Sequence, residues 1–291
     1  MMNAPLEKRN RQTLLEKRKR QMRRATAIAR TLVGVELALV ALPLLVIVVW
    51  AFTDAWPWPD LWPQAFSARG IEQALSGRQN MGWDTLALSI GIAAACAVLT
   101  TAVAALACRA LCHFQWRGRD VFQFATILPF IIPSTVFAMG IQVVFLQIGL
   151  ARTVPGVILA HSIVALPYAI ILMTDITRAA GTHREEAARS LGAGPWQMLR
   201  HVTIPQLLPG IVSSLSMCYI MSFSQYFLTL LVGGGRVQTF VLVLFPYLSG
   251  GDRTIACAYS LVFLVVTFAV FLIFELLLRR FGAREEGSLY G

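Results

Sequence analysis

Residues 182–205 read THREEAARSLGAGPWQMLRHVTIP and lie between two long apolar runs of the chain. Thr182 and Glu185 have the spacing of a capping box, which predicts that a helix begins here, with the Thr182 hydroxyl capping it and Glu185 reaching back. Gly192 is typical of a helix C-terminus, and Pro195 suits the first turn of another helix. The stretch therefore predicts two short helices joined by a turn.

Outward from this stretch, the chain holds six apolar runs, each close to the roughly 20 residues that a helix needs to cross a bilayer. The sequence is 57% hydrophobic and only 14% charged, whereas a soluble domain carries about 25% charged residues. We therefore expect an all-α polytopic membrane protein with six transmembrane helices. Their expected bounds are 31–52, 85–108, 121–146, 154–174, 209–232 and 254–278.

The charges of the connecting segments orient these spans. If the N-terminus is cytoplasmic, 20 of the 25 Lys and Arg residues fall on the inside, which predicts an N-in, C-in topology. This distribution accounts for the net charge of +10, so we do not expect nucleic-acid binding. The chain then divides into a basic cytoplasmic arm (1–30), a membrane domain (31–278) with its main cytoplasmic loop at 175–208, and a cytoplasmic tail (279–291).

The basic arm is too long for the n-region of a cleavable signal peptide, and the apolar run behind it is too long for an h-region. Residues 14–24 could form a basic helix on the anionic inner leaflet. The alternative, which we favour, is a disordered arm that only enforces the topology.

Metal binding and nucleotide chemistry are not expected of this chain. Cys108, Cys112 and His113 lie close together, but two thiols and one imidazole fall short of the four ligands of a structural zinc site. The glycine run 233–235 has no following Lys and does not form a phosphate loop. We expect no catalytic residues and no cofactor bound by this chain.

The fifth span carries polar side chains on one face, by helical numbering at 100° per residue. They are a candidate solute pathway, consisting of Ser216, Tyr219, Ser222, Gln225 and Tyr226. The alternative is close helix packing, which serine mediates in membranes.

Helix breakers and one ionisable residue also lie inside the spans. Pro129 and Pro133 in the third span and Pro167 in the fourth each remove a backbone hydrogen bond and should bend their helices. His161 lies inside the fourth span, where it is either a neutral, hydrogen-bonded side chain or a proton relay. We favour the neutral side chain.

The cytoplasmic loop carries a resemblance to a known family. Glu186-Ala187-Ala188, three residues, Gly192, nine residues and then Val202-Thr203-Ile204-Pro205 resembles the EAA loop of binding-protein-dependent ATP-binding-cassette importer permeases. Val202 and Ile204 replace the family's Ile and Leu. Leu128-Pro129 with Pro133 is also similar to the family's third span.

The layout looks most like the polyamine, ferric-ion, thiamine and aminophosphonate branch of this family. Polyamine-type members often carry adjacent acidic residues late in the fifth span. Residues 222–226 here read SFSQY and hold no carboxylate, so polyamine import is in doubt.

The resemblance implies a type I importer permease fold in a bacterial inner membrane, forming half of a pore. It also implies several partners: a second permease subunit, identical or different, an ATPase dimer that holds ATP and Mg, and an extracytoplasmic solute-binding protein. The loop would supply the coupling helix that the ATPase receives. Glu186 would be its polar contact, Ala187 and Ala188 would allow close approach, Gly192 would make the turn, and Pro205 would complete the motif.

Two other classes of protein compete with this interpretation. A secondary, ion-coupled transporter needs charges near the bilayer centre, and among them only His161 comes close. A non-transporting membrane scaffold has no need of bent spans or an ordered cytoplasmic loop. The EAA-like loop favours the importer permease over both.

Overall fold

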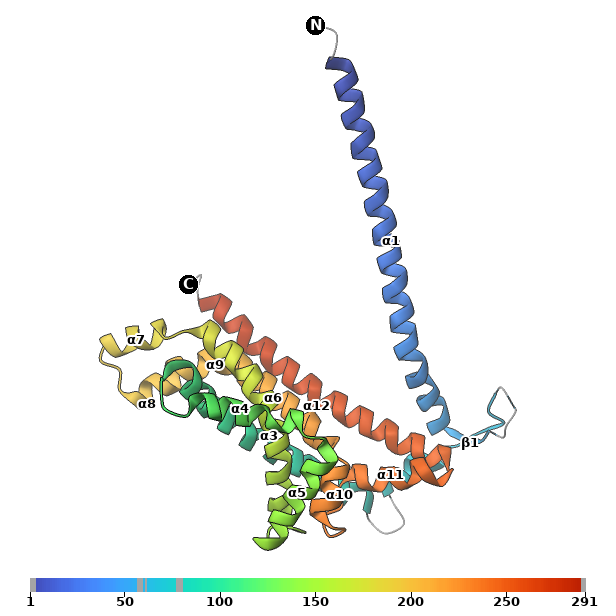
Figure 1. Cartoon of the computed structure of the whole chain (residues 1–291). Helices are drawn as coiled ribbons and strands as arrows, with labels where there is room; N and C mark the ends of the chain where they lie inside the picture. The colour runs from blue at the N-terminus through green and yellow to red at the C-terminus, as the bar shows by residue number, and fades with distance from the viewer. Residues whose placement is uncertain (1–3, 57–59, 61, 77–80, 289–291) are drawn as a thin grey trace.

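A computed structural model of the chain describes residues 4–56, 60, 62–76 and 81–288, and it is built almost entirely of helices (Figure 1). The helices in chain order are α1 (Ala4–Ala51), α2 (Arg69–Ser76), α3 (Met81–His113), α4 (Arg119–Ile131), α5 (Ser134–Gln147), α6 (Val154–Ala180), α7 (His183–Ser190), α8 (Pro195–Met198), the π-helical segment η1 (Leu199–Thr203), α9 (Ile204–Phe223), α10 (Phe227–Gly233), α11 (Phe240–Gly250) and α12 (Arg253–Ser288). Strands β1 (Thr53–Ala55) and β2 (Ala65–Phe66) pair antiparallel after α1.

Among the residues that the structure describes, five helical stretches are long and apolar enough to cross a membrane, and a bent pair of helices brings the number to six if it counts as one span. The five are Ile28–Ala51, Gly82–His113, Val154–Ala180, Pro195–Phe223 and Arg253–Leu276. The prediction of an all-α polytopic membrane protein is therefore confirmed.

The predicted third span is not one continuous helix. It divides into α4 and α5, which meet at an angle of 108°. Pro133 forces the residue before it out of the helical region, and Ile132 is extended with ψ of 131°. Pro133 therefore produces a break rather than a gentle bend, whereas Pro129 lies inside α4.

The predicted fifth span is also wrong in its bounds. The helix runs without a gap from α8 through η1 into α9 and ends at Phe223, and α10 begins after a short break. The Ser224 hydroxyl shares its single proton between the carbonyls of Ile220 at 2.9 Å and Met221 at 3.2 Å, which competes with continuation of the helix. The short apolar helix α11 between α10 and α12 was not predicted.

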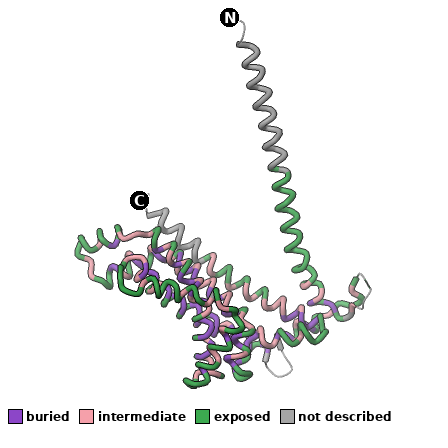
Figure 2. The backbone as a smooth tube through the Cα atoms, in the orientation of Figure 1, coloured by how far each residue is buried: buried purple, intermediate pink, exposed green. Residues whose placement is uncertain are grey.

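Helices α3, α6 and α9 pack against one another and form the core, where the buried residues concentrate (Figure 2). Small buried side chains such as Ala97, Ala104 and Ala169 let the helix backbones approach closely. The Cys108 thiol contacts the Ile170 carbonyl at 3.2 Å, so this cysteine joins α3 to α6. The three helices thereby form a rigid frame beneath the cytoplasmic loop.

Helix α1 stands apart from this frame, and its described side chains are mostly exposed (Figure 2). Its contacts lie at its C-terminal end, where the Arg253 guanidinium lies 5.6 Å from the Trp50 ring centroid. The Thr254 hydroxyl donates to the Thr53 carbonyl at 2.8 Å. Because α1 begins at Ala4, residues 4–30 are helical, in place of the disordered arm that we favoured from the sequence.

Candidate functional site

The cytoplasmic loop forms a short helical unit that projects from one end of the bundle. Figure 1 places α7 and α8 at the opposite end of the molecule from β1. Helix α7 follows α6 directly, and α8 leads through η1 into α9. The loop therefore lies between two helices of the core frame, where a force applied to α7 would reach both.

The turn after α7 has the hydrogen bonds of a Schellman motif. The Ala193 N–H donates to the Ala188 carbonyl at 3.0 Å, and the Gly192 N–H donates to the Arg189 carbonyl at 2.9 Å. Gly192 adopts a φ of +82°, which a residue with a side chain rarely adopts. The prediction that Gly192 ends the helix is confirmed.

The predicted capping box at the start of α7 is wrong. Thr182 precedes the helix, but its side chain makes no capping hydrogen bond and instead donates to Glu186 Oε1 at 2.6 Å. Glu185 does not reach back to cap the helix either. Its carboxylate points into the bundle and has other partners.

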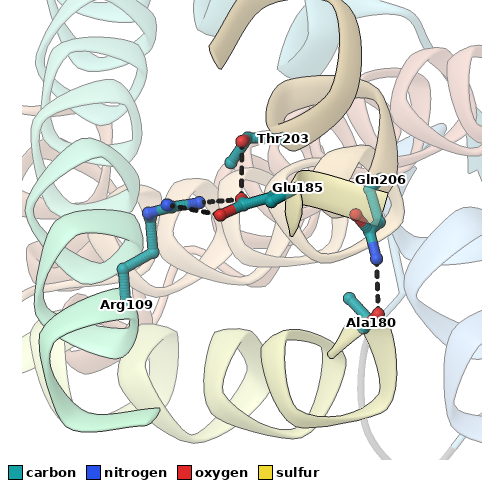
Figure 3. A network of polar contacts seen from close by, with 5 residues as sticks. All are labelled: Arg109, Ala180, Glu185, Thr203 and Gln206. Carbon is teal, nitrogen blue, oxygen red and sulfur yellow. Dashed lines mark hydrogen bonds and ion pairs between the residues drawn. The ribbon is translucent and has the colours of Figure 1, made fainter. Parts of the chain in front are cut away.

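Glu185 forms a two-pronged ion pair with Arg109, which lies near the end of α3 (Figure 3). Arg109 Nη1 lies 2.6 Å from Glu185 Oε1, and Nη2 lies 3.1 Å from Oε2. The Thr203 hydroxyl of η1 donates to the same Oε1 at 2.6 Å. The Glu185 side chain is only 10% exposed and that of Arg109 is 23% exposed. One carboxylate thus ties α7 to both α3 and η1.

A second contact closes the same junction. The Gln206 amide near the start of α9 donates to the carbonyl of Ala180, the last residue of α6, at 2.5 Å (Figure 3). The two ends of the loop are therefore joined to each other as well as to α3.

The environment of Glu185 favours its charged form. The Arg109 guanidinium, which donates two hydrogen bonds, lowers the pKa of this carboxyl below its ordinary value, with smaller contributions from the Thr203 hydroxyl and the charge of His113. Burial acts in the opposite direction and is outweighed. Glu185 is therefore ionised at neutral pH, and a bidentate charged pair of this kind is among the stronger hydrogen-bonded contacts in proteins.

The sequence reasoning missed this ion pair. Glu185 and Glu186 are adjacent and so point about 100° apart around α7, which means that only one of them can face the bundle. That geometry was available from the sequence. The partner was not, because Arg109 lies 76 positions away in the chain.

The outward side of the loop presents apolar side chains to solvent. Leu191 is 88% exposed and Trp196 is 71% exposed, while Glu186 and Ala187 are also exposed and Ala188 is partly buried. Pro205 is exposed in the first turn of α9. Two large apolar side chains, Leu191 and Trp196, are therefore left uncovered at this end of the chain.

The candidate pathway residues do not share one surface. Tyr219 and Ser222 are buried within the chain, whereas Ser216, Gln225 and Tyr226 are partly exposed. The helical numbering that grouped them does not hold beyond Phe223, where α9 ends. Their role in a solute pathway stays a prediction.

His161 joins the two sides of the break after α9. Its Nδ1 lies 2.8 Å from the Ser222 hydroxyl of α9, and its Nε2 lies 2.9 Å from the Thr229 hydroxyl of α10. Thr229 donates its own proton to the Gln225 carbonyl at 2.7 Å, so its oxygen accepts from Nε2–H and Ser222 donates to Nδ1. A neutral imidazole satisfies all of these contacts, which agrees with the structural role favoured from the sequence.

Comparison with known proteins places this architecture in a family. The sequence model of the family described as "binding-protein-dependent transport system inner membrane component" matches residues 97–284. PhnV of Salmonella paratyphi A, a candidate permease for 2-aminoethylphosphonate transport, is 26% identical over 245 residues, which cover 84% of this chain and 91% of PhnV. The molybdenum transport permease ModB of Mycobacterium tuberculosis is 31% identical over 201 residues, which cover 64% of this chain and 76% of ModB.

Solved structures show the same fold. A chain of a bacterial ABC transporter involved in import of the acidic polysaccharide alginate matches with a TM-score of 0.68 at 19% identity, over 88% of this chain and 97% of that one. A chain of the MetNI methionine ABC transporter matches with a TM-score of 0.51 at 17% identity, over 73% of this chain and 94% of that one. The chain therefore belongs to the binding-protein-dependent transport system inner membrane component family, the permease subunits of ATP-binding-cassette importers.

Proposed function

We propose that this permease subunit receives the motion of a separate ATPase pair through α7 and forms half of a pathway for a small solute delivered by an extracytoplasmic binding protein. Its relatives are named for solutes as different as 2-aminoethylphosphonate, spermidine or putrescine, and molybdenum. The proposal is therefore restricted to a small solute without a name.

One observation carries the coupling proposal. Helix α7 exposes Glu186 and Ala187 on one side, while Glu185 on another side is held by Arg109 and Thr203. A helix that only connects two spans needs no internal anchor. A helix that passes a push from outside into the bundle needs both an exposed contact face and a rigid attachment.

The exposed apolar side chains of the loop support a protein partner at this end. Leu191 and Trp196 lie on either side of the Gly192 turn. Tryptophan is enriched in protein interfaces, where it fills pockets of the partner. We assign this face, consisting of Glu186, Ala187, Leu191 and Trp196, to the ATPase.

The experiment is to co-express the chain with candidate ABC ATPase and permease subunits from the same genome and to reconstitute the purified complex in liposomes. We expect ATP hydrolysis to rise several-fold when the matching binding protein is added with its ligand. A secondary transporter would instead accumulate solute without ATP and would lose that uptake when an ionophore dissipates the ion gradient. Uptake of that kind, with no ATPase co-purifying, would overturn the proposal.

A further inference from the structure

A cavity with both apolar and polar lining lies between the cytoplasmic ends of α3, α4 and α6, apart from the α7 contact face. Its volume is about 200 Å³. Leucine and isoleucine side chains of the three helices form its apolar wall. The polar lining comes from two helices: Arg119, Gln123 and Thr126 of α4, and Thr174, Asp175 and Arg178 of α6.

The spacing of these residues places two polar stripes opposite each other. Arg119, Gln123 and Thr126 follow one another at intervals of four and three, which puts them on one face of α4. Thr174 and Arg178 are four residues apart on α6, and Asp175 lies three before Arg178. The polar lining of the cavity therefore comes from one face of α4 and one face of α6.

Three charged side chains line the cavity: Asp175 and Arg178 are exposed, and Arg119 is partly buried. Within residues 4–56, 60, 62–76 and 81–288, neither Arg178 nor Asp175 makes an ion pair within 4.0 Å. Arg119 donates from Nη1 to Gln115 at 3.1 Å, but its Nε is buried and has no acceptor. Arg109, one helix turn from the same end of α3, is fully paired with Glu185. A buried donor without an acceptor costs free energy unless a ligand supplies one.

The residue types define the ligand. Two guanidinium groups match the oxygens of a phosphate or phosphonate, and the exposed Gln123 amide can donate to a further oxygen, whereas the Thr126 hydroxyl already donates to the Gln123 carbonyl. Asp175 can only accept when ionised, so it suits a cationic amine on the same ligand. We propose that this cavity binds a phosphate or phosphonate group that carries a primary amine.

Two sources can supply this chemistry at the inner membrane face. One is a free small molecule that passes through the transporter or regulates it. The other is the headgroup of phosphatidylethanolamine from the inner leaflet. The site does not rest on the coupling proposal, because none of its residues belongs to α7 or to the ion pair of Glu185.

The test is calorimetric titration of the purified full-length chain, in a neutral detergent, with O-phosphoethanolamine, inorganic phosphate and ethanolamine. We expect saturable binding of phosphoethanolamine, weaker binding of phosphate, and still weaker binding of ethanolamine. Arg119→Gln and Arg178→Gln should each weaken phosphoethanolamine binding about tenfold or more, because each removes a charged donor. Asp175→Asn should abolish the preference for phosphoethanolamine over phosphate.

Arg117→Gln is the matched control, since Arg117 is exposed, lies two residues from Arg119 and does not line the cavity. Its binding should equal that of the wild type. Arg119→Lys and Arg178→Lys keep the charge and should retain part of the affinity. Partial binding in these variants would show that the glutamine variants lose the binding site and not the fold. Thermal unfolding of each variant checks the fold independently.

A lipid measurement distinguishes the two sources. Native mass spectrometry counts phosphatidylethanolamine molecules retained by the wild type and by Arg119→Gln/Arg178→Gln after equal detergent washing. If the double variant retains one lipid fewer than the wild type, the cavity binds the lipid headgroup. If both proteins retain the same number of lipids while the wild type binds phosphoethanolamine, the cavity binds a free molecule. The proposal is overturned if no phosphate compound binds saturably and retention is equal, or if Arg117→Gln changes binding as much as the cavity variants do.

Discussion

Two adjacent glutamates in the cytoplasmic loop have different surroundings and different expected roles. Glu185 is buried against Arg109 and Thr203, whereas Glu186 is exposed and accepts from Thr182. The EAA-like motif points to Glu186, but the residue that fixes the orientation of α7 is its neighbour. The ion pair between Glu185 and Arg109 is therefore the single contact on which the orientation of α7 most depends.

Replacing Arg109 with Met should destabilise the protein by about 1–3 kcal/mol, because the buried Glu185 carboxylate then keeps its charge without a cation beside it. The double variant Arg109→Met/Glu185→Gln should lose less than Arg109→Met, since neither charge remains unpaired. Thermal unfolding of the purified chain gives both values in a double-mutant cycle. Strictly additive losses would show that the two side chains do not interact.

The same pair predicts a pH dependence. Since the pKa of Glu185 is lower in the folded protein than its ordinary value, the pair stabilises the fold fully at pH values above that ordinary value. This stabilisation is lost as the pH falls through the lowered pKa. The difference in unfolding free energy between wild type and Glu185→Gln should therefore be constant from pH 8 to about 6 and shrink below about 4. A difference that grows on acidification would contradict the assignment.

The sequence could predict some of these residue-scale features but not others. The positive φ of Gly192 follows from its place after a helical run, because local backbone chemistry decides it. The predicted capping box failed because the Thr182 hydroxyl donates to Glu186 and because Glu185 is paired with Arg109, a residue distant in the chain. Local spacing carries no information about such a partner.

At the scale of elements, apolar length predicted where the helices lie but not where they break. The second and sixth spans appear as α3 and α12, each longer than expected at both ends. The fourth appears as α6, which begins at Val154 as expected and continues to Ala180. The breaks at α4/α5 and α9/α10 depend on Pro133 and on the hydroxyl of Ser224. Hydropathy alone does not record where backbone hydrogen bonds are lost. Pro133 was recognisable from the sequence as a helix breaker, but the 108° angle at that break was not.

His161 should stabilise the break between α9 and α10. His161→Leu removes both of its hydrogen bonds and leaves the Ser222 hydroxyl buried without a partner, so we expect a loss of about 1–3 kcal/mol. Hydrogen exchange should rise in residues 224–233. Ser162→Ala, next in sequence and also buried, is the control and should leave that segment unchanged. Equal hydrogen exchange in wild type and His161→Leu would show that His161 does not stabilise this break. The proton-relay hypothesis for His161 would then be the one to test.

At the scale of the whole molecule, the chain is built as part of a larger assembly. None of the residues in the most apolar part of the α1 span is buried inside the chain. Helix α4 likewise exposes Val121 and Phe124. Lipid or a second permease subunit would cover these surfaces, and the N-in, C-in orientation would place the α7 contact face toward the cytoplasm.

The most direct test of the coupling proposal is binding-protein-stimulated ATP hydrolysis by the reconstituted complex with wild type, Glu186→Ala and Asp120→Ala. Asp120 is also an exposed acidic residue on the cytoplasmic side, but it lies on α4 and away from the α7 contact face. We expect Glu186→Ala to lose most of the stimulation while the complex still assembles, and Asp120→Ala to match the wild type. Full stimulation in Glu186→Ala, or an equal loss in both variants, would contradict the assignment of α7 as the helix that couples ATP hydrolysis to transport.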